Sequence, residues 1–366
     1  MKIIPQYEPY LDQREADNLA QCIKDNWITG GKRVKEFESR MAKLTGAKHA
    51  IACCNGTMAL YVGLKAMGIG EGDKVIVPDF TFVASANSVV MAGAEPVFCD
   101  IDSKSFCMSD KLVDSVIKDK KVKAIMPVGI YGNSPDMDEI CLLAKNEGFG
   151  IIEDVAQDIR VTWDGKHLGT FGDVGCMSFY ADKTICLGEG GMVFTDDDDL
   201  AERVVRLLNQ GRTKRGWYVH ETIGFNFRTS DLHAAVGLAQ LDKLDEIVGK
   251  KKAHEELYRD LLADTEQVEF PKIDERCFNV PFRHNILVKS PDKLSKYLDS
   301  VGIGNLRFFY PLHRQPCYKY LNYNDKIFPN AMKIYSRGLS LPSSVKLTDS
   351  DIDYVCDHIR RFCKGK

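Results

Sequence analysis

The sequence predicts an α/β protein with a mostly parallel central sheet flanked by helices, followed by a smaller α+β domain. Three observations predict it. Short apolar segments alternate with helical patterns over the first part of the chain. A long amphipathic run then follows a helix-capping sequence, and beyond it the alternation stops. Because parallel strands need crossover connections, which helices usually supply, this pattern favours a parallel sheet covered on both faces.

The predicted strands are short apolar runs, and the predicted helices carry apolar residues at three- and four-residue spacing. We expect helices at 11–26, 33–45, 57–67, 110–118 and 136–147. We expect strands at 48–52, 75–78, 95–102, 124–128, 150–155 and 176–180, and a further strand-like segment at 192–196. The glycine-rich GIGEGD at 68–73 is expected to be a surface turn.

The second part of the chain begins with Thr229, Ser230 and Asp231, which supply helix-capping side chains. We expect one long helix after them, joining two domains. A boundary near residues 245–250 gives a large domain over 1–248 and a small domain over 249–366. In the small domain we expect a strand at 285–289, helices at 291–301 and 349–364, and a proline-interrupted loop at 308–313.

The composition excludes several classes of protein. The 366 residues hold 49 basic and 52 acidic side chains, a net charge of −3, which argues against a nucleic-acid partner. The N-terminus is charged where a signal peptide needs an apolar region, and no apolar run is long enough for a membrane span. The 12 cysteines are scattered without a CxxC pair. We therefore expect reduced thiols, no metal site and a cytoplasmic protein.

A candidate anion site lies between the strand at 48–52 and the helix at 57–67. Gly56 and Thr57 would offer backbone N–H groups at the start of the helix, and Thr57 also a hydroxyl. Unpaired N–H groups and the helix dipole both favour a phosphate there. An ordinary capped turn explains the same residues, so this motif is not sufficient alone.

Two ionisable residues lie at or just after the ends of predicted strands. Asp154 ends an apolar strand, at the sheet edge where α/β proteins bind ligands, and Gln157 follows it by three residues. Lys183 comes after Ser178 and before a segment rich in glycine, which permits close approach of the backbone to a cofactor. A helix cap for Asp154 and a solvated loop for Lys183 are the alternatives when either is taken alone.

Together these residues are the parts that pyridoxal 5′-phosphate (PLP) requires. The helix start would hold the phosphate, Asp154 would keep the pyridine nitrogen protonated, and Lys183 would form a Schiff base and move protons. Partial burial lowers the pKa of a lysine, which favours this chemistry. Phe82, after the strand at 75–78, would stack on the ring.

Several ordered segments carry a resemblance to one family. They are NGTMAL (55–60), VIVPDFTFVASAN (75–87), AEPVFCDID (94–102), IIEDVAQ (151–157), the glycine-rich stretch 172–197 and GFNFRTSDLHAAVGLAQLDKLDEI (224–247). Through them the chain resembles the DegT/DnrJ/EryC1/StrS family of PLP-dependent nucleotide-sugar aminotransferases. The resemblance implies the aspartate aminotransferase fold (PLP fold type I) and a homodimer with shared active sites.

The resemblance also implies roles for individual residues. Lys183 matches the Schiff-base lysine and Asp154 the partner of the pyridine nitrogen. Asn226 matches a residue that the second subunit lends to the phosphate, and Arg228 a position associated with the carboxylate of the amino donor. The other matched cofactor contacts are Gly56, Thr57 and Ser178 for the phosphate, Phe82 for the ring face and Gln157 for a hydroxyl.

Within the family, segments 178–184, 220–228 and 307–313 are similar to a subgroup that converts GDP-4-keto-6-deoxy-D-mannose to GDP-perosamine with L-glutamate as donor. The chain departs from that subgroup at Gly129 and at Gln157–Asp158–Ile159, which border the cofactor or sugar pocket. The resemblance places four residues near the sugar nucleotide, although aromatics beside prolines also pack loops: Trp27, Phe309, Tyr310 and His313.

Three alternatives are left open by the sequence. One is a sugar aminotransferase acting at C4 or C3 of a UDP- or dTDP-linked keto sugar. Another is a related dehydratase, which has histidine in place of the Schiff-base lysine and is therefore disfavoured by Lys183. The third is a non-catalytic PLP-binding regulatory protein, against which Lys183, Asp154 and Thr57 argue together.

Overall fold

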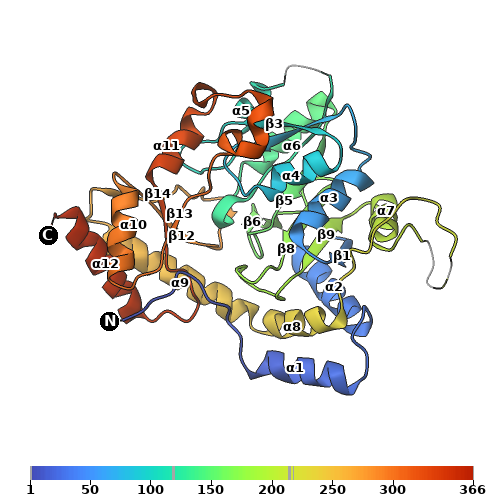
Figure 1. Ribbon diagram of the computed structural model, residues 1–366, viewed down its shortest axis with the longest axis horizontal. Coiled ribbons are helices and arrows are strands. Elements are labelled where there is room, and N and C mark those ends of the chain that lie inside the picture. The colour runs from blue at the N-terminus through green and yellow to red at the C-terminus, as the bar shows by residue number, and fades with distance from the viewer. Residues whose placement is uncertain (1, 118–119, 213–215, 217, 366) are drawn as a thin grey trace.

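The computed structural model describes residues 2–117, 120–212, 216 and 218–365 (Figure 1). At its centre is a seven-stranded sheet in the order β1-β9-β8-β5-β4-β2-β3. Its strands are β1 (His49–Cys53), β2 (Lys74–Pro78), β3 (Glu95–Cys99), β4 (Val122–Ile125), β5 (Gly150–Asp154), β8 (Val174–Ser178) and β9 (Gly191–Thr195). Strands β3, β2, β4, β5 and β8 run parallel, whereas β9 pairs antiparallel with both of its neighbours. The predicted mostly parallel sheet is confirmed.

The register of the central strands brings three segments of the chain together at one edge. Cys53 of β1 pairs with Gly191 of β9, and Gly191 pairs with Ser178 of β8. Asp154, the last residue of β5, pairs with Cys176 of β8. The segments that follow β1, β5 and β8 therefore start close together. They do so at the carboxyl ends of the parallel strands, where α/β proteins bind ligands.

Helices cover both faces of the sheet, because side chains alternate across each strand. Val193 of β9 packs into one apolar cluster with α3 (Gly56–Ala66). Its neighbours Met192 and Phe194 pack into a second cluster with α2 (Lys32–Thr45) and α8 (Asp231–Asp242). The other helices around this sheet are α1 (Gln13–Lys24), α4 (Ala84–Met91), α5 (Asp110–Asp114), α6 (Met137–Glu147) and α7 (Asp198–Leu208), with the short helix η1 (Ile130–Gly132).

A smaller, antiparallel sheet lies in the C-terminal part, in the order β10-β12-β14-β13. Its strands are β10 (Val268–Glu269), β12 (His284–Val288), β13 (Leu306–Arg307) and β14 (Gly338–Leu341). Around it lie α9 (Leu244–Leu262), α10 (Pro291–Ser300), α11 (Pro329–Arg337), α12 (Asp349–Cys363), η2 (Leu312–Arg314), η3 (Pro316–Leu321) and η4 (Asp325–Ile327). A third sheet joins β6 (Thr162–Trp163) to β7 (Lys166–His167) and β11 (Cys277–Phe278). The domain boundary predicted at 248/249 falls within α9 and stays a prediction.

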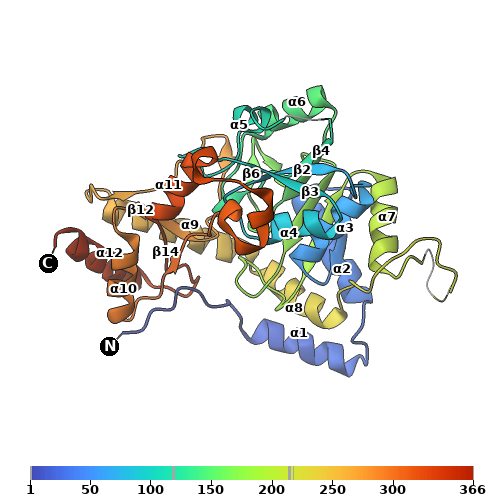
Figure 2. The same cartoon turned by 45° about the horizontal axis from the view of Figure 1, so that its top comes forward.

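The N-terminal segment crosses from the C-terminal sheet to the central one. Ile4 is buried in the apolar cluster of the C-terminal part and forms a parallel bridge with Ile303. Its N–H donates to Gly302 O at 2.8 Å, and farther along Ser343 N donates to Gln6 O at 2.7 Å. The chain then enters α1, which packs against α8 (Figures 1 and 2). Residues 2–10 therefore link both parts of the molecule.

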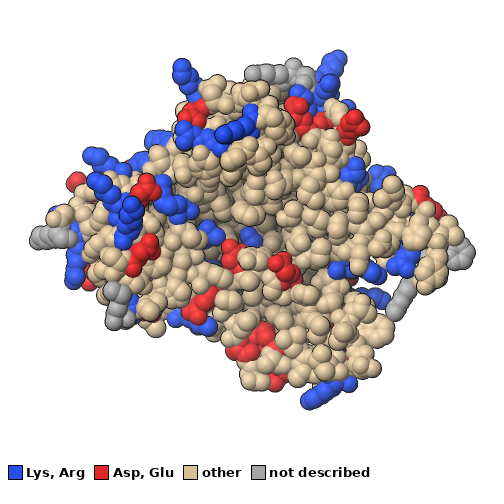
Figure 3. Space-filling view, in the orientation of Figure 1, with Lys and Arg blue, Asp and Glu red and all other residues tan. Residues whose placement is uncertain are grey.

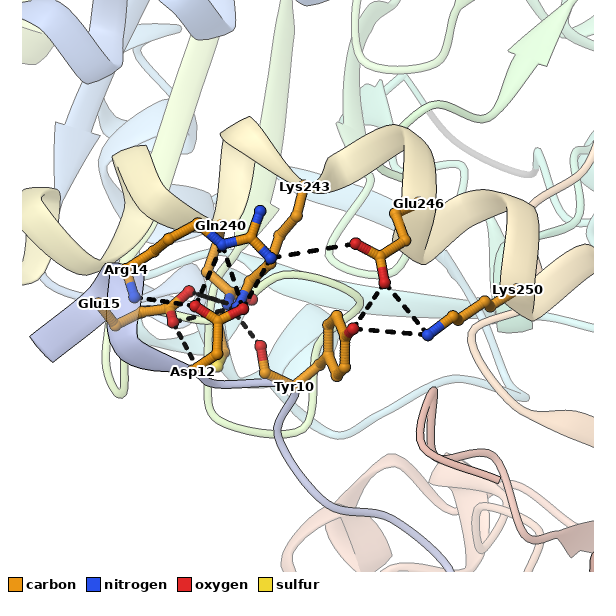
Figure 4. Close-up of polar contacts among 9 residues, drawn as sticks. Tyr10, Asp12, Arg14, Glu15, Gln240, Lys243, Glu246 and Lys250 are labelled. Carbon is orange, nitrogen blue, oxygen red and sulfur yellow. Dashed lines mark hydrogen bonds and ion pairs between the residues drawn. The ribbon is translucent and has the colours of Figure 1, made fainter. Parts of the chain in front are cut away.

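The one long helix predicted after the capping sequence is wrong, because two helices occupy this part of the chain. Helix α8 ends at Asp242 and α9 begins at Leu244, since Lys243 has φ −115° and ψ 13°. The Lys243 side chain is fully buried, and its ammonium lies 2.8 Å from Glu15 and 3.1 Å from Asp12 (Figure 4). The helix is therefore interrupted at this buried lysine, although the amphipathic pattern of the sequence continues through it.

The other predicted elements are present with their ends shifted by at most three residues, except at 110–118. There α5 ends at Asp114, and residue 118 lies outside the described residues. None of the 12 cysteines, all of which are described, forms a disulfide. Among the described helices, none is long and apolar enough to cross a membrane.

Candidate active site

A cavity of about 570 Å³ opens where the carboxyl ends of β5 and β8 meet the start of α3. Figure 3 shows this face of the molecule hollowed near its centre. Eight of the predicted site residues line the cavity: Gly56, Thr57, Phe82, Asp154, Gln157, Ser178, Lys183 and Phe309. Asp182, Phe282 and Arg283 also line it, and the sequence did not single them out.

The start of α3 forms the anion-binding end of the cavity. The Asn55 side chain caps the helix by accepting from Met58 N at 2.9 Å, which leaves the N–H groups of Gly56 and Thr57 for an anion. Gly56 lies so close to β8 that a Cβ there would be 2.6 Å from Ser178 Cβ. Glycine is therefore the residue that permits this approach.

Asp154 is a buried carboxylate at the end of β5, 5% exposed. Its Oδ2 accepts from Ser85 Oγ at 2.6 Å, and its Oδ1 accepts from Ala156 N at 3.1 Å. Burial raises the pKa of Asp154, against the lowering effect of these hydrogen bonds and of the Lys183 charge. A buried carboxylate is costly without a positive partner, so this position favours a cationic group in the cavity.

Lys183 lies in a turn after β8, where its N–H donates to Tyr180 O at 2.9 Å. Its Nζ is 4.6 Å from the centre of the Phe282 ring and 3.9 Å from Asp182 Oδ1. Burial lowers the pKa of Lys183, although the charges of Asp182 and Asp154 oppose this. A lowered pKa leaves more of the amine unprotonated near neutral pH, and the unprotonated amine is the form that acts as nucleophile and base in the predicted role.

Aromatic rings form one side of the cavity. Phe82, half exposed, lies with its ring centre 5.8 Å from that of Phe309. Phe309 in turn stacks on Tyr131 at 5.3 Å, with the ring planes 13° apart. The amide oxygen of Gln157 accepts from Tyr131 N at 2.7 Å, which fixes this side chain beside the rings.

Asn226, Arg228 and Trp27 do not line the cavity of the chain that bears them. Arg228 is exposed and donates to Asn226 Oδ1 at 2.9 Å and to Asn209 Oδ1 at 3.0 Å. Trp27 borders a separate cleft beside Gly31. The roles that the resemblance implies for these residues stay predictions.

Tyr310 and His313 also lie outside the cavity lining. Tyr310 packs edge-on against Tyr335, with ring centres 5.2 Å apart. His313 is buried, with Nδ1 2.7 Å from Asp79 and Nε2 3.1 Å from Asp325. Burial would lower the pKa of His313, but the two carboxylates outweigh it and raise that pKa above its ordinary value. This geometry favours the packing alternative for His313, while its role at the sugar nucleotide stays a prediction.

Sequence reasoning missed Ser85 and Arg283. Ser85 lies on α4 and contacts Asp154 only through the fold, so nothing in its local sequence marks it. Arg283 stands directly before the apolar strand β12 and far from Lys183 in the chain. A charge at the start of an apolar strand was the available signal, and it does not indicate a ligand.

The cavity fits pyridoxal 5′-phosphate on the evidence of its own residues. An anion-binding helix start, a buried carboxylate and an amine of lowered pKa surround one space. A protonated pyridine nitrogen would supply the positive partner that Asp154 lacks. The volume of about 570 Å³ is typical of a small-molecule site.

Comparison with known proteins gives the same picture. The model of the DegT/DnrJ/EryC1/StrS aminotransferase family matches residues 9–360. A GDP-perosamine synthase from Vibrio cholerae is 38% identical over 98% of this chain and 99% of its own. A UDP-2-acetamido-2-deoxy-3-oxo-D-glucuronate aminotransferase from Pseudomonas aeruginosa is 32% identical over 89% of each chain. The structure of S. venezuelae DesV superposes with a TM-score of 0.93 and 31% identity, covering 98% of this chain and 99% of that one.

Proposed function

The chain belongs to the DegT/DnrJ/EryC1/StrS family and is a PLP-dependent sugar aminotransferase, and from this premise we propose that it transfers the amino group of L-glutamate to GDP-4-keto-6-deoxy-D-mannose. The product would be GDP-perosamine. The observation that carries the proposal is the 38% identity, along nearly the whole length of both chains, to a GDP-perosamine synthase.

The residues of the cavity divide the work of holding the cofactor. PLP, when bound, supplies an electron sink for the carbanion that amino transfer requires. We assign its phosphate to the backbone of Gly56 and Thr57 and to Ser178, because these groups meet at the start of α3. Asp154 holds the proton on the ring nitrogen, and the Ser85 hydroxyl orients that carboxylate at 2.6 Å.

Lys183 moves the protons of both halves of the reaction. Because burial lowers its pKa, its amine is available to take the α-proton of glutamate. In the second half, the same group returns a proton to the sugar carbon that receives nitrogen. Phe82 and Gln157 border the same space and are assigned to the ring face and the hydroxyl of the cofactor.

A homodimer is part of the proposal. Asn226, Arg228 and Trp27 are exposed and do not line the cavity of their own chain, which supports a role for them in the site of a second copy. Phe309, which lines the cavity, is assigned to the sugar-nucleotide side of the site. The resemblance also places Tyr310 and His313 there, and for both residues this stays a prediction. A cytoplasmic location, expected from the sequence, completes the proposal.

The test separates the two halves of the reaction. The holoenzyme is treated with L-glutamate, freed of it, and then mixed with GDP-4-keto-6-deoxy-D-mannose while the cofactor absorbance is followed. We expect glutamate to change the absorbance and the GDP sugar to restore it, at a rate at least tenfold above UDP- and dTDP-linked keto sugars. Lys183→Ala is the control and should show neither change.

Other outcomes identify the alternatives. Faster recovery with a UDP-linked 3-keto sugar would favour the reaction named for the Pseudomonas relative, at 32% identity. Recovery with a dTDP-linked keto sugar would move the substrate to that nucleotide. No absorbance change with any amino acid would favour a non-catalytic PLP-binding protein.

A further inference from the structure

Arg283 is a second cation of the cavity, and the proposed mechanism does not use it. It stands directly before β12 and is the one arginine among the described residues that line this space. Its side chain is 13% exposed. Arg228, the arginine that the sequence suggested for the donor's carboxylate, lies outside this lining and is exposed.

The guanidinium of Arg283 is held in place by its surroundings. It lies over two aromatic rings, 5.0 Å from the centre of Phe282 and 5.6 Å from that of Phe309. Its Nη2 donates to Asp182 Oδ2 at 3.2 Å. Within the described part of the chain, this is the one hydrogen bond that the guanidinium donates to protein. Most of its five N–H donors are therefore left for water or a ligand.

Asp182 stands between Arg283 and Lys183. While Oδ2 accepts from Arg283, Oδ1 is buried, has no hydrogen-bond partner among the described residues and lies 3.9 Å from Lys183 Nζ. A single carboxylate therefore serves two cations, and neither contact is short. A carboxylate that arrived with a substrate would find an arginine that shares Asp182 and the Phe282 ring with the reacting lysine and is only loosely engaged.

The position of Arg283 selects among the ionised groups of the reactants. The α-carboxylate of an amino acid is attached to the carbon that gives its proton to Lys183, so it must lie close to that lysine. The diphosphate of a nucleotide sugar is separated from the keto carbon by the sugar ring. We propose, resting on the proposed function, that Arg283 binds the carboxylate of the amino-acid donor, and that this carboxylate displaces Asp182 from the guanidinium.

The experiment measures donor and acceptor separately on the holoenzyme. Arg283→Gln is compared with Arg283→Lys and with its matched control Arg361→Gln, which replaces an exposed arginine of α12. Arg228→Gln is measured as well, because it tests the arginine that the resemblance suggested for the donor's carboxylate. We expect Arg283→Gln to lower kcat/KM for L-glutamate by about 100-fold or more, the loss typical of a charge-assisted pair. The reaction of the amino form of the enzyme with keto sugar should change by less than about threefold. Arg283→Lys should recover part of the loss.

A binding measurement distinguishes a role in carboxylate binding from a structural role, because two variants should change the Kd in opposite directions. The probe is 2-oxoglutarate, titrated into the holoenzyme by calorimetry. Its Kd should rise about 100-fold in Arg283→Gln. It should fall severalfold in Asp182→Asn, because the competing carboxylate is removed.

Several results would overturn the inference. In the kinetics, they are an equal loss of rate in both half-reactions of Arg283→Gln, or loss of glutamate turnover in Arg228→Gln alone. In the calorimetry, they are an unchanged Kd for 2-oxoglutarate in Arg283→Gln, weaker binding of 2-oxoglutarate in Asp182→Asn, or no binding of it to the wild type. Failure of every keto sugar to react would instead reject the proposed function. In that case glutamate turnover and 2-oxoglutarate binding would still decide the role of Arg283.

Discussion

Lys183 and Lys243 are both withdrawn from solvent, and the protein compensates their charges very differently. Lys243 is fully buried, and two carboxylates lie within 3.1 Å of its ammonium: Glu15 at 2.8 Å and Asp12 at 3.1 Å (Figure 4). Gln240 also donates to Glu15 at 2.7 Å. This lysine is a structural cation that fastens α1 to the junction of α8 and α9.

Lys183 lacks comparable partners. Among the described residues, Asp182 is the one carboxylate within 4 Å of Lys183 Nζ, and its Oδ1 lies 3.9 Å away. The Phe282 ring also lies beside this ammonium. Burial therefore lowers the pKa of Lys183. The comparison teaches that burial alone does not make a lysine reactive. The carboxylates that surround it decide whether its proton is held or released.

The largest expected effect is the loss of activity in Lys183→Ala. Because this amine both bonds the cofactor and moves protons, kcat for amino transfer should fall by about 10⁴-fold or more. The midpoint of thermal unfolding of the cofactor-free protein should change little, since no close ion pair is lost. If Lys183→Ala kept more than a tenth of the wild-type kcat, Lys183 would not be the catalytic lysine.

The next effect is on stability, in Lys243→Met. Removal of this cation leaves Glu15 buried and uncompensated, so the free energy of unfolding should fall by about 3–5 kcal/mol. Urea unfolding measures it. The matched control is Lys250→Met, because Lys250 pairs with Glu246 on the surface and should contribute under about 1 kcal/mol. Equal losses in both variants would remove the distinction between the two kinds of lysine.

The third effect concerns the carboxylate on the other side of the cofactor. Asp154→Asn should lower kcat by about 10²–10³-fold, because the variant cannot hold a positive charge on the ring nitrogen. The cofactor-free protein should be no less stable, since a buried charge whose pKa is raised has been removed. Steady-state kinetics and urea unfolding measure the two effects. Lower stability together with unchanged kcat would show that Asp154 is a structural residue.

The smallest expected effect is a pH dependence of stability caused by Lys251, a third buried lysine that adds to the comparison of Lys183 with Lys243. Lys251 donates to the carbonyls of Phe282 at 3.1 Å and Ser343 at 3.4 Å, and burial lowers its pKa to about 8. Between pH 8 and about 10.4, this lysine is protonated in the unfolded chain but has lost its proton in the folded protein. The free energy of unfolding therefore rises with pH through that range. The slope should approach about 1.4 kcal/mol per pH unit.

The slope is isolated by comparison with Lys251→Met. The difference in the free energy of unfolding between wild type and variant should grow from pH 8 to pH 10. A difference independent of pH would mean that Lys251 keeps its proton, as a lysine compensated by carboxylates does.

The sequence predicted the parts of the site that local patterns mark. Asp154 ends a short apolar strand, Gly56 and Lys183 follow two others, and parallel strands end at one edge, so the pattern alone brings them together. Arg283 could not be found in this way, because it reaches the cavity from the C-terminal part of the chain. The break at Lys243 was missed because a lysine within a helical pattern is ordinarily solvated, and its carboxylate partners lie more than 200 residues earlier.

The strap formed by residues 2–10 has a consequence for the timing of synthesis. Ile4 is buried against Ile303, and Gln6 accepts from Ser343 N, so both contacts require chain that is made well after residues 2–10. Domains otherwise form from the N-terminus as the chain emerges. Here residues 2–10 leave the ribosome before the segments that hold them, so they reach their places late. Until then, Ile4 has no apolar cluster to pack into.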